Sequence, residues 1–327
     1  MKVLYLDCQS GISGDMTLSA LIDLGADITY IREKLENLPI DPFSLNVKQV
    51  DKKGISAKML DLHFKEEALV HEAHSHGEHH HTHEGHSHSH GEHHHAHEGH
   101  SHSHGEHHHA HEGHSHSHDD VHHAHEGHSH SHDDVHHAHE GHSHSHDEHH
   151  HHTHRKASTI STMINESELP SRVKKRSSAV FQVIAEAEGK IHGMDPNDVH
   201  FHEVGAMDSI IDVIGVCLAL ENLGIDKLIA SPVPTGYGKV MMAHGLYPIP
   251  APATAEILRG VPLADFHVKG ELTTPTGAGF LKALADEYGY MPAMSIERIG
   301  YGAGKKNFNH PNVLRVLLFQ TKDEPQR

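Results

Sequence analysis

Long hydrophobic runs, cysteines and positive charges are all scarce in this 327-residue chain. Its two cysteines, Cys8 and Cys217, exclude a disulfide framework and make a reducing cytoplasm the expected compartment. The longest apolar stretch, residues 210–220, is interrupted by Asp212 and is too short to span a bilayer. Asp7 ends the N-terminal apolar stretch too early for a secretion signal. The sequence therefore predicts a soluble, cytoplasmic protein without a membrane segment.

Residues 71–154 lack lysine and arginine altogether, but they contain fifteen acidic residues and 41 of the 48 histidines. The phrase His-Glu-Gly-His-Ser-His-Ser-His occurs there five times, at steps of fourteen residues from His83 onward. Imidazole is a ligand for nickel, copper, zinc and iron rather than for magnesium or calcium, so this insert predicts binding of a transition metal. Its only large aliphatic side chains are Val121 and Val135, and we expect it to be disordered without metal.

Outside the insert, acidic and basic residues almost balance, at 30 of the former against 26 of the latter. This balance excludes the strongly basic signature of a nucleic-acid-binding protein. The remaining 243 residues are enough for one large domain or two small ones. We expect a single layered domain formed by residues 1–70 and 155–320, with the insert projecting as a surface loop and residues 321–327 as a tail.

Short apolar runs alternate with helical periodicity in both halves of this domain. Strands are expected at residues 3–6, 44–50, 57–64, 228–230, 239–242 and 313–319. Helices are expected at residues 16–24, 30–38, 170–192, 208–223, 252–259 and 277–288. Strands that alternate with helices of this length indicate the α/β class, with a mixed α+β arrangement as the alternative.

A glycine-rich segment joins the first predicted strand to the first predicted helix. Backbone N–H groups at such a helix start can hold an anion or a phosphate, although the spacing matches neither the P-loop nor the Rossmann pattern. The candidate binding residues are Ser10, Gly11, Ser13 and Gly14. On either side, Asp7 and Asp15 could supply metal or acid/base chemistry. The alternative is a tight turn in which Asp15 is only a helix-start acid.

The strongest local signal outside the insert lies in residues 200–212. In extended backbone His200 and His202 point to one side, and Asp208 and Asp212 share a helix face four residues apart. Carboxylates at this spacing repel each other unless a cation or a basic group lies between them. A mixed nitrogen and oxygen site for nickel, iron or zinc is therefore predicted, with the metal ligands His200, His202, Glu203 and Asp208. Alternatively, Asp208 caps the helix and Glu203 is solvated.

Three further glycine-containing segments could bind phosphate. Lys239 follows a loop rich in proline and glycine, whereas Thr274 and Thr276 stand at another predicted helix start and could equally serve as N-caps. Residues 300–306 combine three glycines with two adjacent lysines, a pattern of low specificity. A nucleophile elbow and a Cys-x-x-Cys pair are both missing, which argues against a hydrolase triad and a structural zinc site.

Together these segments resemble the LarC family of nickel insertion proteins, which act in the biosynthesis of the nickel-pincer nucleotide. The resemblance extends through nearly all of the chain outside the insert. It rests on residues 6–16, 200–212, 234–236, 274–277 and 299–304. A histidine-rich insert of variable length at this place is also typical of the family. The resemblance implies a CTP-dependent cyclometallase that places Ni(II) into pyridinium-3,5-bisthiocarboxylic acid mononucleotide. The product would be the cofactor of lactate racemase-type enzymes.

The chain ends at Arg327 and lacks the C-terminal part that resembles the CTP-binding portion of longer family members. We therefore expect CTP, with Mg or Mn, to require a separate C-terminal partner chain, and a lactate racemase-type apoenzyme to receive the cofactor. Asp7, Asp15 or Asp212 would accept the ring proton as the nickel–carbon bond forms. The alternative is a non-catalytic nickel store or metallochaperone, and zinc or cobalt chemistry is compatible with the same ligands.

Overall fold

The computed structural model describes residues 1–64, 102–104, 107–109, 155–201, 207–242 and 245–320. The chain forms two compact units, one of Met1–Ala68 with His149–Arg327 and the other of Leu69–Glu148. In the second unit, β4 (His102–His104) and β5 (His107–His109) form an antiparallel pair. We predicted that the insert, residues 71–154, is disordered without metal. Apart from β4 and β5, its residues lie outside the described ones.

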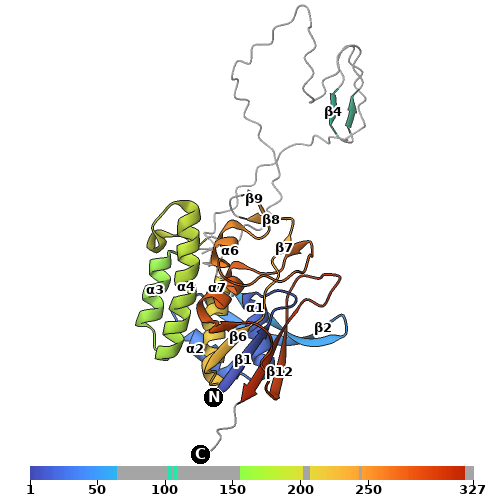
Figure 1. Cartoon of the computed structure of the whole chain (residues 1–327). Coiled ribbons are helices and arrows are strands. Elements are labelled where there is room, and N and C mark those ends of the chain that lie inside the picture. The colour runs from blue at the N-terminus through green and yellow to red at the C-terminus, as the bar shows by residue number, and fades with distance from the viewer. Residues whose placement is uncertain (65–101, 105–106, 110–154, 202–206, 243–244, 321–327) are drawn as a thin grey trace, which may run out of the picture. The chain divides into compact units, whose positions relative to one another are not determined.

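A mixed seven-stranded sheet is the frame of the first unit (Figure 1). Its strands are β1 (Lys2–Asp7), β2 (Phe43–Lys52), β3 (Ile55–Phe64), β6 (Lys227–Ala230), β11 (Glu287–Tyr288), β12 (Ile296–Ala303) and β13 (Val313–Gln320). Their order is β11-β6-β1-β13-β12-β3-β2. Strand β1 pairs in parallel with β6 and antiparallel with the central strand β13, so the sheet joins both ends of the described chain.

The strand β1 is apolar along most of its length because both of its faces are covered. Leu4 and Leu6 belong to the main core on the helical side of the sheet. Val3 and Tyr5, which alternate with them, pack with Leu317 on the opposite face. A continuous apolar run of this kind is the pattern of a strand buried on both sides, and the sequence predicted a buried strand here for that reason.

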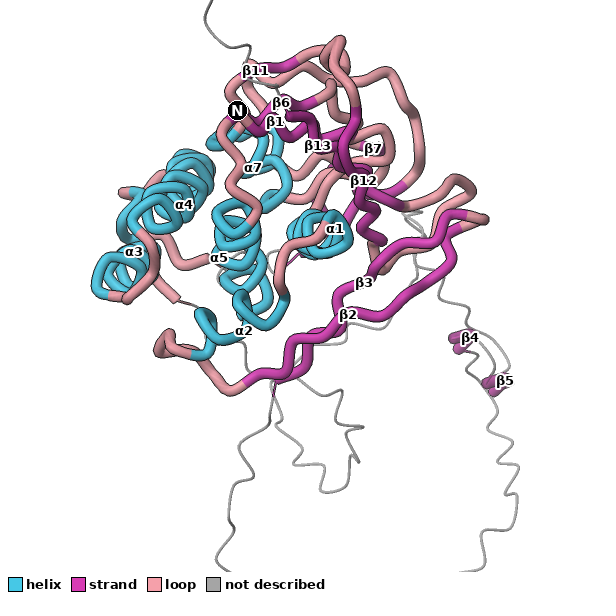
Figure 2. Tube along the Cα trace, turned by 90° about the horizontal axis from the view of Figure 1, so that it is seen from below, coloured by secondary structure: helices cyan, strands magenta, loops and turns pink. Residues whose placement is uncertain are grey.

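The helices lie on one side of the sheet in successive layers. They are α1 (Gly14–Leu24), α2 (Ile28–Glu36), α3 (Ala157–Glu166), α4 (Ser171–His192), α5 (Met207–Asn222), α6 (Pro252–Ile257) and α7 (Pro275–Leu284), with a 3₁₀ turn at Pro196–Asp198. Figure 2 shows α1 within the curve of the sheet, followed outward by α5, α4 and α3. Accordingly α1 packs against β12, β3 and β13, and α4 packs against α5 and α7.

Two short antiparallel pairs complete the first unit. They are formed by β7 (Gly236–Tyr237) with β10 (Gly270–Glu271), and by β8 (Lys239–Met242) with β9 (Gly245–Pro248). The strand β10 leads into α7, and its neighbour Leu272 accepts a hydrogen bond from Ile12 in the loop after β1. This contact brings two of the glycine-rich segments together.

Two glycines of β12 allow α1 to approach the sheet closely. A Cβ atom on Gly302 would lie 1.9 Å from the carbonyl oxygen of Met16, and one on Gly300 would lie 2.3 Å from that of Ala20. Residues two apart on a strand face the same side, so both glycines lie under α1. The two glycines therefore form a flat surface on which α1 packs, and this contact holds the start of α1 in place relative to the sheet.

The predicted α/β class is confirmed by the central sheet and its covering helices. The helix predicted over residues 277–288 is wrong at its C-terminal end, because α7 stops at Leu284 and β11 follows. There the Asp286 N–H donates to the Leu228 carbonyl at 2.8 Å, which draws the chain to the sheet edge. Neither α3 nor β12 was predicted. Within the described ranges, no helix is long and apolar enough to cross a membrane.

Candidate functional site

The starts of α1, α5 and α7 surround a cavity of about 240 Å³. Leu60 and Leu62 of β3 form an apolar wall, and the segment after β12 contributes Lys305. The polar side chains that line the cavity are Ser13, Asp15, Asp208, Ser209, Asp212, Glu271, Thr274, Thr276 and Lys305. Four carboxyl groups therefore share the described lining with a single lysine.

Backbone hydrogen bonds join the loop after β1 to the segment before α7. The Ile12 N–H donates to the Leu272 carbonyl at 3.0 Å, and the Thr274 N–H donates to the Ile12 carbonyl at 3.1 Å. Gly11 has a φ of 96°, and a Cβ atom there would lie 2.0 Å from the Leu272 oxygen. A Cβ atom on Gly277 would lie 2.2 Å from the Ile12 oxygen. Glycine at these two positions lets the two helix starts lie side by side.

Asp212, in the second turn of α5, has a strongly perturbed carboxyl group. Its Oδ1 is sealed from solvent and has no hydrogen-bond partner among the described residues, although other atoms of the residue are accessible. Burial raises the pKa of Asp212 well above its ordinary value, and the negative charges of Asp15 and Asp208 raise it further, whereas Lys305 lowers it. A carboxylate in this setting binds a proton more tightly than an ordinary aspartate does, as a general base requires.

Asp15 lies at the second residue of α1. Its Oδ1 accepts hydrogen bonds from Ser13 Oγ at 2.5 Å and from the Met16 N–H at 2.8 Å. The preceding residue, Gly14, abuts Asp212, since a Cβ atom there would lie 2.4 Å from Asp212 Oδ2. The start of α1 can therefore meet the α5 carboxylate only because residue 14 is glycine.

Glu271 and Lys305 also line the cavity, although neither was among the site residues selected from the sequence. Burial raises the pKa of Glu271, while the charge of Lys306, whose Nζ lies 3.5 Å away, lowers it. Both residues belong to glycine-containing segments that the sequence indicated as phosphate loops. Their meeting across the cavity depends on the β7–β10 pair and on the turn after β12, which no local pattern reveals.

The structure gathers seven of the sequence-predicted site residues at the cavity. These are Ser13, Gly14, Asp15, Asp208, Asp212, Thr274 and Thr276. Thr274 also has the capping role that was its alternative, because its hydroxyl accepts a hydrogen bond from the Gly277 N–H at 3.2 Å. The three segments that the sequence treated separately thus form one site.

The remaining predicted residues do not line the cavity. The Asp7 carboxylate accepts hydrogen bonds from Arg315, and Ser10 Oγ donates to the Pro311 carbonyl at 2.9 Å. Gly11 supports the loop crossing described above, and Lys239 is exposed on β8. His200 is exposed, and its backbone bridges to Lys156. His202 and Glu203 lie outside the described residues.

Metal ligands are not preassembled in the part of the chain that the structure describes, where no three His, Cys, Asp or Glu side chains come together as a site. Of the four predicted nickel ligands, only His200 and Asp208 are among the described residues, so the statement applies to these two alone. Of these two, Asp208 faces the acidic cavity.

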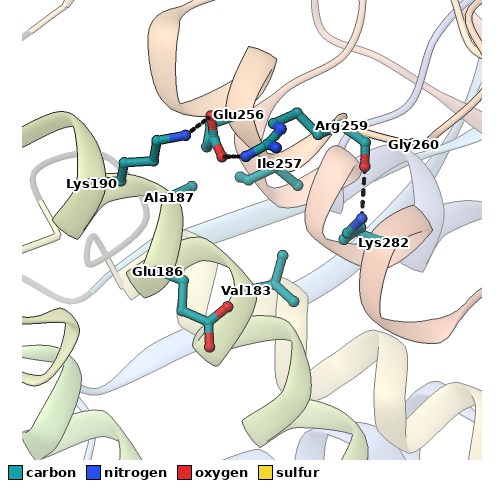
Figure 3. Close-up of a pocket in the computed structure, with 9 residues that line it drawn as sticks. All are labelled: Val183, Glu186, Ala187, Lys190, Glu256, Ile257, Arg259, Gly260 and Lys282. Atoms are coloured by element: carbon teal, nitrogen blue, oxygen red, sulfur yellow. Dashed lines mark hydrogen bonds and ion pairs between the residues drawn. The ribbon is translucent and has the colours of Figure 1, made fainter.

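A larger hollow of about 540 Å³ lies between α4, α6 and α7 (Figure 3). Glu256 accepts hydrogen bonds from Lys190 at 2.8 Å and from Arg259 at 2.7 Å, and Lys282 donates to the Arg259 carbonyl at 2.7 Å. Figure 3 shows Glu186 pointing away from this cluster. Because its charged groups largely satisfy one another, we place the chemistry in the smaller cavity, whose Asp212 is not neutralised in this way.

Comparison with known families identifies the family of the chain. The model of the family described as nickel insertion protein matches residues 4–327. The chain belongs to this family. Membership of the nickel insertion family confirms the resemblance seen in the sequence.

Relatives within the nickel insertion family are named pyridinium-3,5-bisthiocarboxylic acid mononucleotide nickel insertion protein. The one from Staphylococcus saprophyticus is 46% identical over 316 residues, which are 97% of this chain and 59% of the relative. Those from Geobacillus kaustophilus and Desulfitobacterium hafniense are 39% and 36% identical, over 97% and 99% of this chain and 60% of each relative. This chain thus spans about three fifths of the length of these relatives. No solved structure matches it.

Proposed function

We propose that this chain carries the site at which Ni(II) is inserted into pyridinium-3,5-bisthiocarboxylic acid mononucleotide, giving the nickel-pincer nucleotide of lactate racemase-type enzymes. The observation that carries the proposal is the Asp212 carboxyl group, whose Oδ1 is sealed from solvent and unpartnered among the described residues, in a cavity formed by three helix starts. Both the nickel ion and the pyridinium ring are positively charged, so an acidic lining attracts them. Family membership and the names of the relatives support the same reaction.

Asp212 is the base in this proposal. Formation of the nickel–carbon bond requires the ring carbon to lose its proton while the C–H electron pair becomes the bond to nickel. A carboxylate with a raised pKa accepts that proton more readily than an ordinary aspartate. Asp15 is the second candidate, but its Oδ1 already accepts two hydrogen bonds. For Asp7 we propose a structural role through its pair with Arg315.

Nickel is the cargo of the reaction, and we propose that it is bound at the edge of the cavity where α5 begins. Asp208 supplies one oxygen ligand there, and His200, His202 and Glu203 precede it in the chain. Nickel accepts such a mixture of imidazole and carboxylate ligands. The histidine-rich insert, residues 71–154, would gather and buffer the ion before transfer.

The substrate phosphate requires hydrogen-bond donors rather than carboxylates. We propose that it lies at the paired starts of α1 and α7, with Ser13, Gly14, Thr274 and Thr276 around it. Ser10 and Gly11 hold the α1 loop in place from behind. Lys239 had the same assignment in the sequence, but it does not line the cavity.

CTP is assigned to a different part of the assembly. Its triphosphate, even with Mg or Mn, does not fit a cavity whose described lining carries four carboxyl groups and one lysine. We therefore propose that CTP binds through a C-terminal partner chain. The recipient of the finished cofactor would be a lactate racemase-type apoenzyme.

Reconstitution tests the proposal directly. The chain is mixed with Ni(II), CTP with Mg, and the bisthiocarboxylate mononucleotide, with and without a C-terminal partner chain, and the nickel-containing product is measured by mass spectrometry. Asp212→Asn should lower the rate of product formation by about 100-fold or more, because a general base typically contributes that much. The matched control is Asp61→Asn. Asp61 lies between the cavity-lining Leu60 and Leu62 on β3, but adjacent strand residues face opposite sides. Unimpaired insertion by Asp212→Asn would contradict its role as the base.

A nickel store or metallochaperone remains the alternative because 41 histidines lie in the insert. Deletion of residues 71–154 separates the two functions. If the folded part carries the insertion site, product should still form at high nickel concentration and fail only at low nickel concentration. If the folded part neither binds the mononucleotide nor supports insertion at any nickel concentration, storage is the better description.

A further inference from the structure

Lys305 is the only lysine or arginine among the described residues that line the acidic cavity. Its side chain is exposed, and no described carboxylate oxygen lies within ion-pair distance of its Nζ. The neighbouring Lys306, in contrast, is engaged with Glu271 at 3.5 Å. Lys305 therefore has a positive charge directed at the cavity without a fixed contact partner there.

The loop that carries Lys305 is held firmly in place. The Gly304 N–H donates to the Asn312 carbonyl at 3.0 Å, and Nδ2 of the buried Asn312 donates to the Lys306 carbonyl at 2.9 Å. A Cβ atom on Gly304 would lie 2.5 Å from Asn312 Nδ2 and 2.9 Å from Met16 Sδ. The backbone on both sides of Lys305 is thus fixed against α1, the helix that brings Asp15 to the same cavity.

Hydrogen-bond donors of α7 face the cavity together with Lys305. Pro275 and Thr276 are the first two residues of this helix, and the N–H of Thr276 has no acceptor among the described residues. The next two N–H groups are satisfied by Thr274, since Gly277 donates to its Oγ1 at 3.2 Å and Ala278 to its carbonyl at 2.9 Å. The free donors at this helix start are therefore the Thr276 N–H and the lining hydroxyl groups of Thr274 and Thr276. An ammonium group, hydroxyl groups and a helix start are the donors that a phosphomonoester prefers.

We propose that Lys305 is the residue that binds the phosphate of the substrate mononucleotide and so distinguishes it from the corresponding nucleoside. This inference rests on the proposed function. A phosphate dianion entering a cavity with four carboxyl groups meets repulsion, and Lys305 is the cation in the described lining that offsets it. The phosphate would bind at the side of Lys305 and α7, leaving the pyridinium ring toward Asp212 and Asp208.

The experiment combines a change in the protein with a change in the ligand. Binding of the mononucleotide and of its dephosphorylated nucleoside is measured by isothermal titration calorimetry, on the full chain and with the partner chain present where reconstitution requires it. Lys305→Ala should weaken mononucleotide binding about 10- to 100-fold, the range for one charge-assisted contact. Nucleoside binding should be unchanged, and Lys305→Arg should retain most of the affinity. Lys269→Ala, an exposed lysine of a neighbouring segment, is the matched control.

The other outcomes have separate meanings. Equal loss for both ligands would overturn the proposal, because Lys305 would then act on the ring or on Asp212 rather than on the phosphate. A phosphate-dependent loss in Lys239→Ala instead of Lys305→Ala would also overturn it and would restore the assignment made from the sequence. A wild-type protein that binds neither ligand would contradict the proposed function itself, and the role of Lys305 with it.

Discussion

The centre of the sheet and the cavity at the helix starts each enclose an aspartate, in opposite surroundings. Asp7 lies directly opposite Arg315 in the β1–β13 pairing, and Arg315 Nε donates to its Oδ2 at 2.7 Å. Asp212 lies among other carboxyl groups, and its Oδ1 has no partner among the described residues. A buried charge costs free energy unless it is paired, so the first aspartate stabilises the fold whereas the second destabilises it. Proteins retain such a cost where function requires it.

The largest expected change in the free energy of unfolding comes from Asp7→Asn. The substitution removes the charge that pairs with Arg315. Because the Arg315 side chain is 41% exposed, water partly compensates it for the loss of this ion pair. We expect a loss of about 2–3 kcal/mol, the range for hydrogen bonds to charged groups. Urea denaturation in the presence of EDTA measures it. Asp61→Asn, which breaks the exposed pair with Lys48, should cost clearly less, because water screens the charges of an exposed pair. Equal losses would show that burial of the Asp7 pair adds nothing.

Asp212→Asn should have the opposite sign. Removing the charge relieves burial without a partner and the repulsion from Asp15 and Asp208, so we expect a gain of about 1 kcal/mol in the same urea experiment. The variant would then be more stable than the wild type while it loses nickel insertion. A loss of stability would indicate that the Asp212 carboxyl makes favourable contacts in solution.

The pH dependence of stability also distinguishes Asp212 from an ordinary aspartate. The raised pKa of Asp212 means that the folded chain binds this proton more tightly than the unfolded chain does. Its favourable contribution is fully present below the ordinary aspartate pKa of about 4, and it is lost as the pH rises through the raised value. Since asparagine does not titrate, the stability difference between Asp212→Asn and wild type should grow as the pH rises from about 4 through the raised pKa of Asp212. A difference that stays flat with pH would contradict the burial of the carboxyl group.

The smallest effect is expected in the hollow between α4, α6 and α7. Its pair of Lys190 with Glu256 is short, at 2.8 Å, but the lysine side chain is 57% exposed. Lys190→Ala should change the free energy of unfolding by less than about 0.5 kcal/mol and leave nickel insertion unchanged. A large loss of insertion in this variant would move the functional site from the smaller cavity to the larger hollow.

The parts of the site that obey local rules were predictable from the sequence. The spacing of Asp208 and Asp212 requires only one helix, and the glycines around Ser13 indicate a helix start after a strand. The different roles of Asp7 and Asp212 were not predictable, because Arg315, which distinguishes them, is 308 residues away from Asp7. The segment of Lys305 was a candidate phosphate loop in the sequence, but its place at this cavity was not predictable, since it depends on the packing of β12 against α1.

In the fold, too, the elements with clear local patterns were predictable, and those that depend on distant contacts were not. The buried strand β1 and the long helix α4 show clear apolar patterns, and both were found. The strand β12 contains glycines that are unfavourable in isolated strands, so its sequence resembled a loop. Only the close approach of α1 explains Gly300 and Gly302, and that contact exists in three dimensions alone.

The pairing of β1 with β13 sets an order of events during synthesis. Lys2 pairs with Gln320, so the centre of the sheet cannot close until nearly the whole described chain has left the ribosome. At translation rates of roughly 5–20 residues per second, the histidine-rich segment is complete roughly 8–30 seconds before residue 320 is added. If the insert gathers nickel as we propose, the nascent chain meets the metal before it has a finished cavity, and loading begins while the protein is still being made.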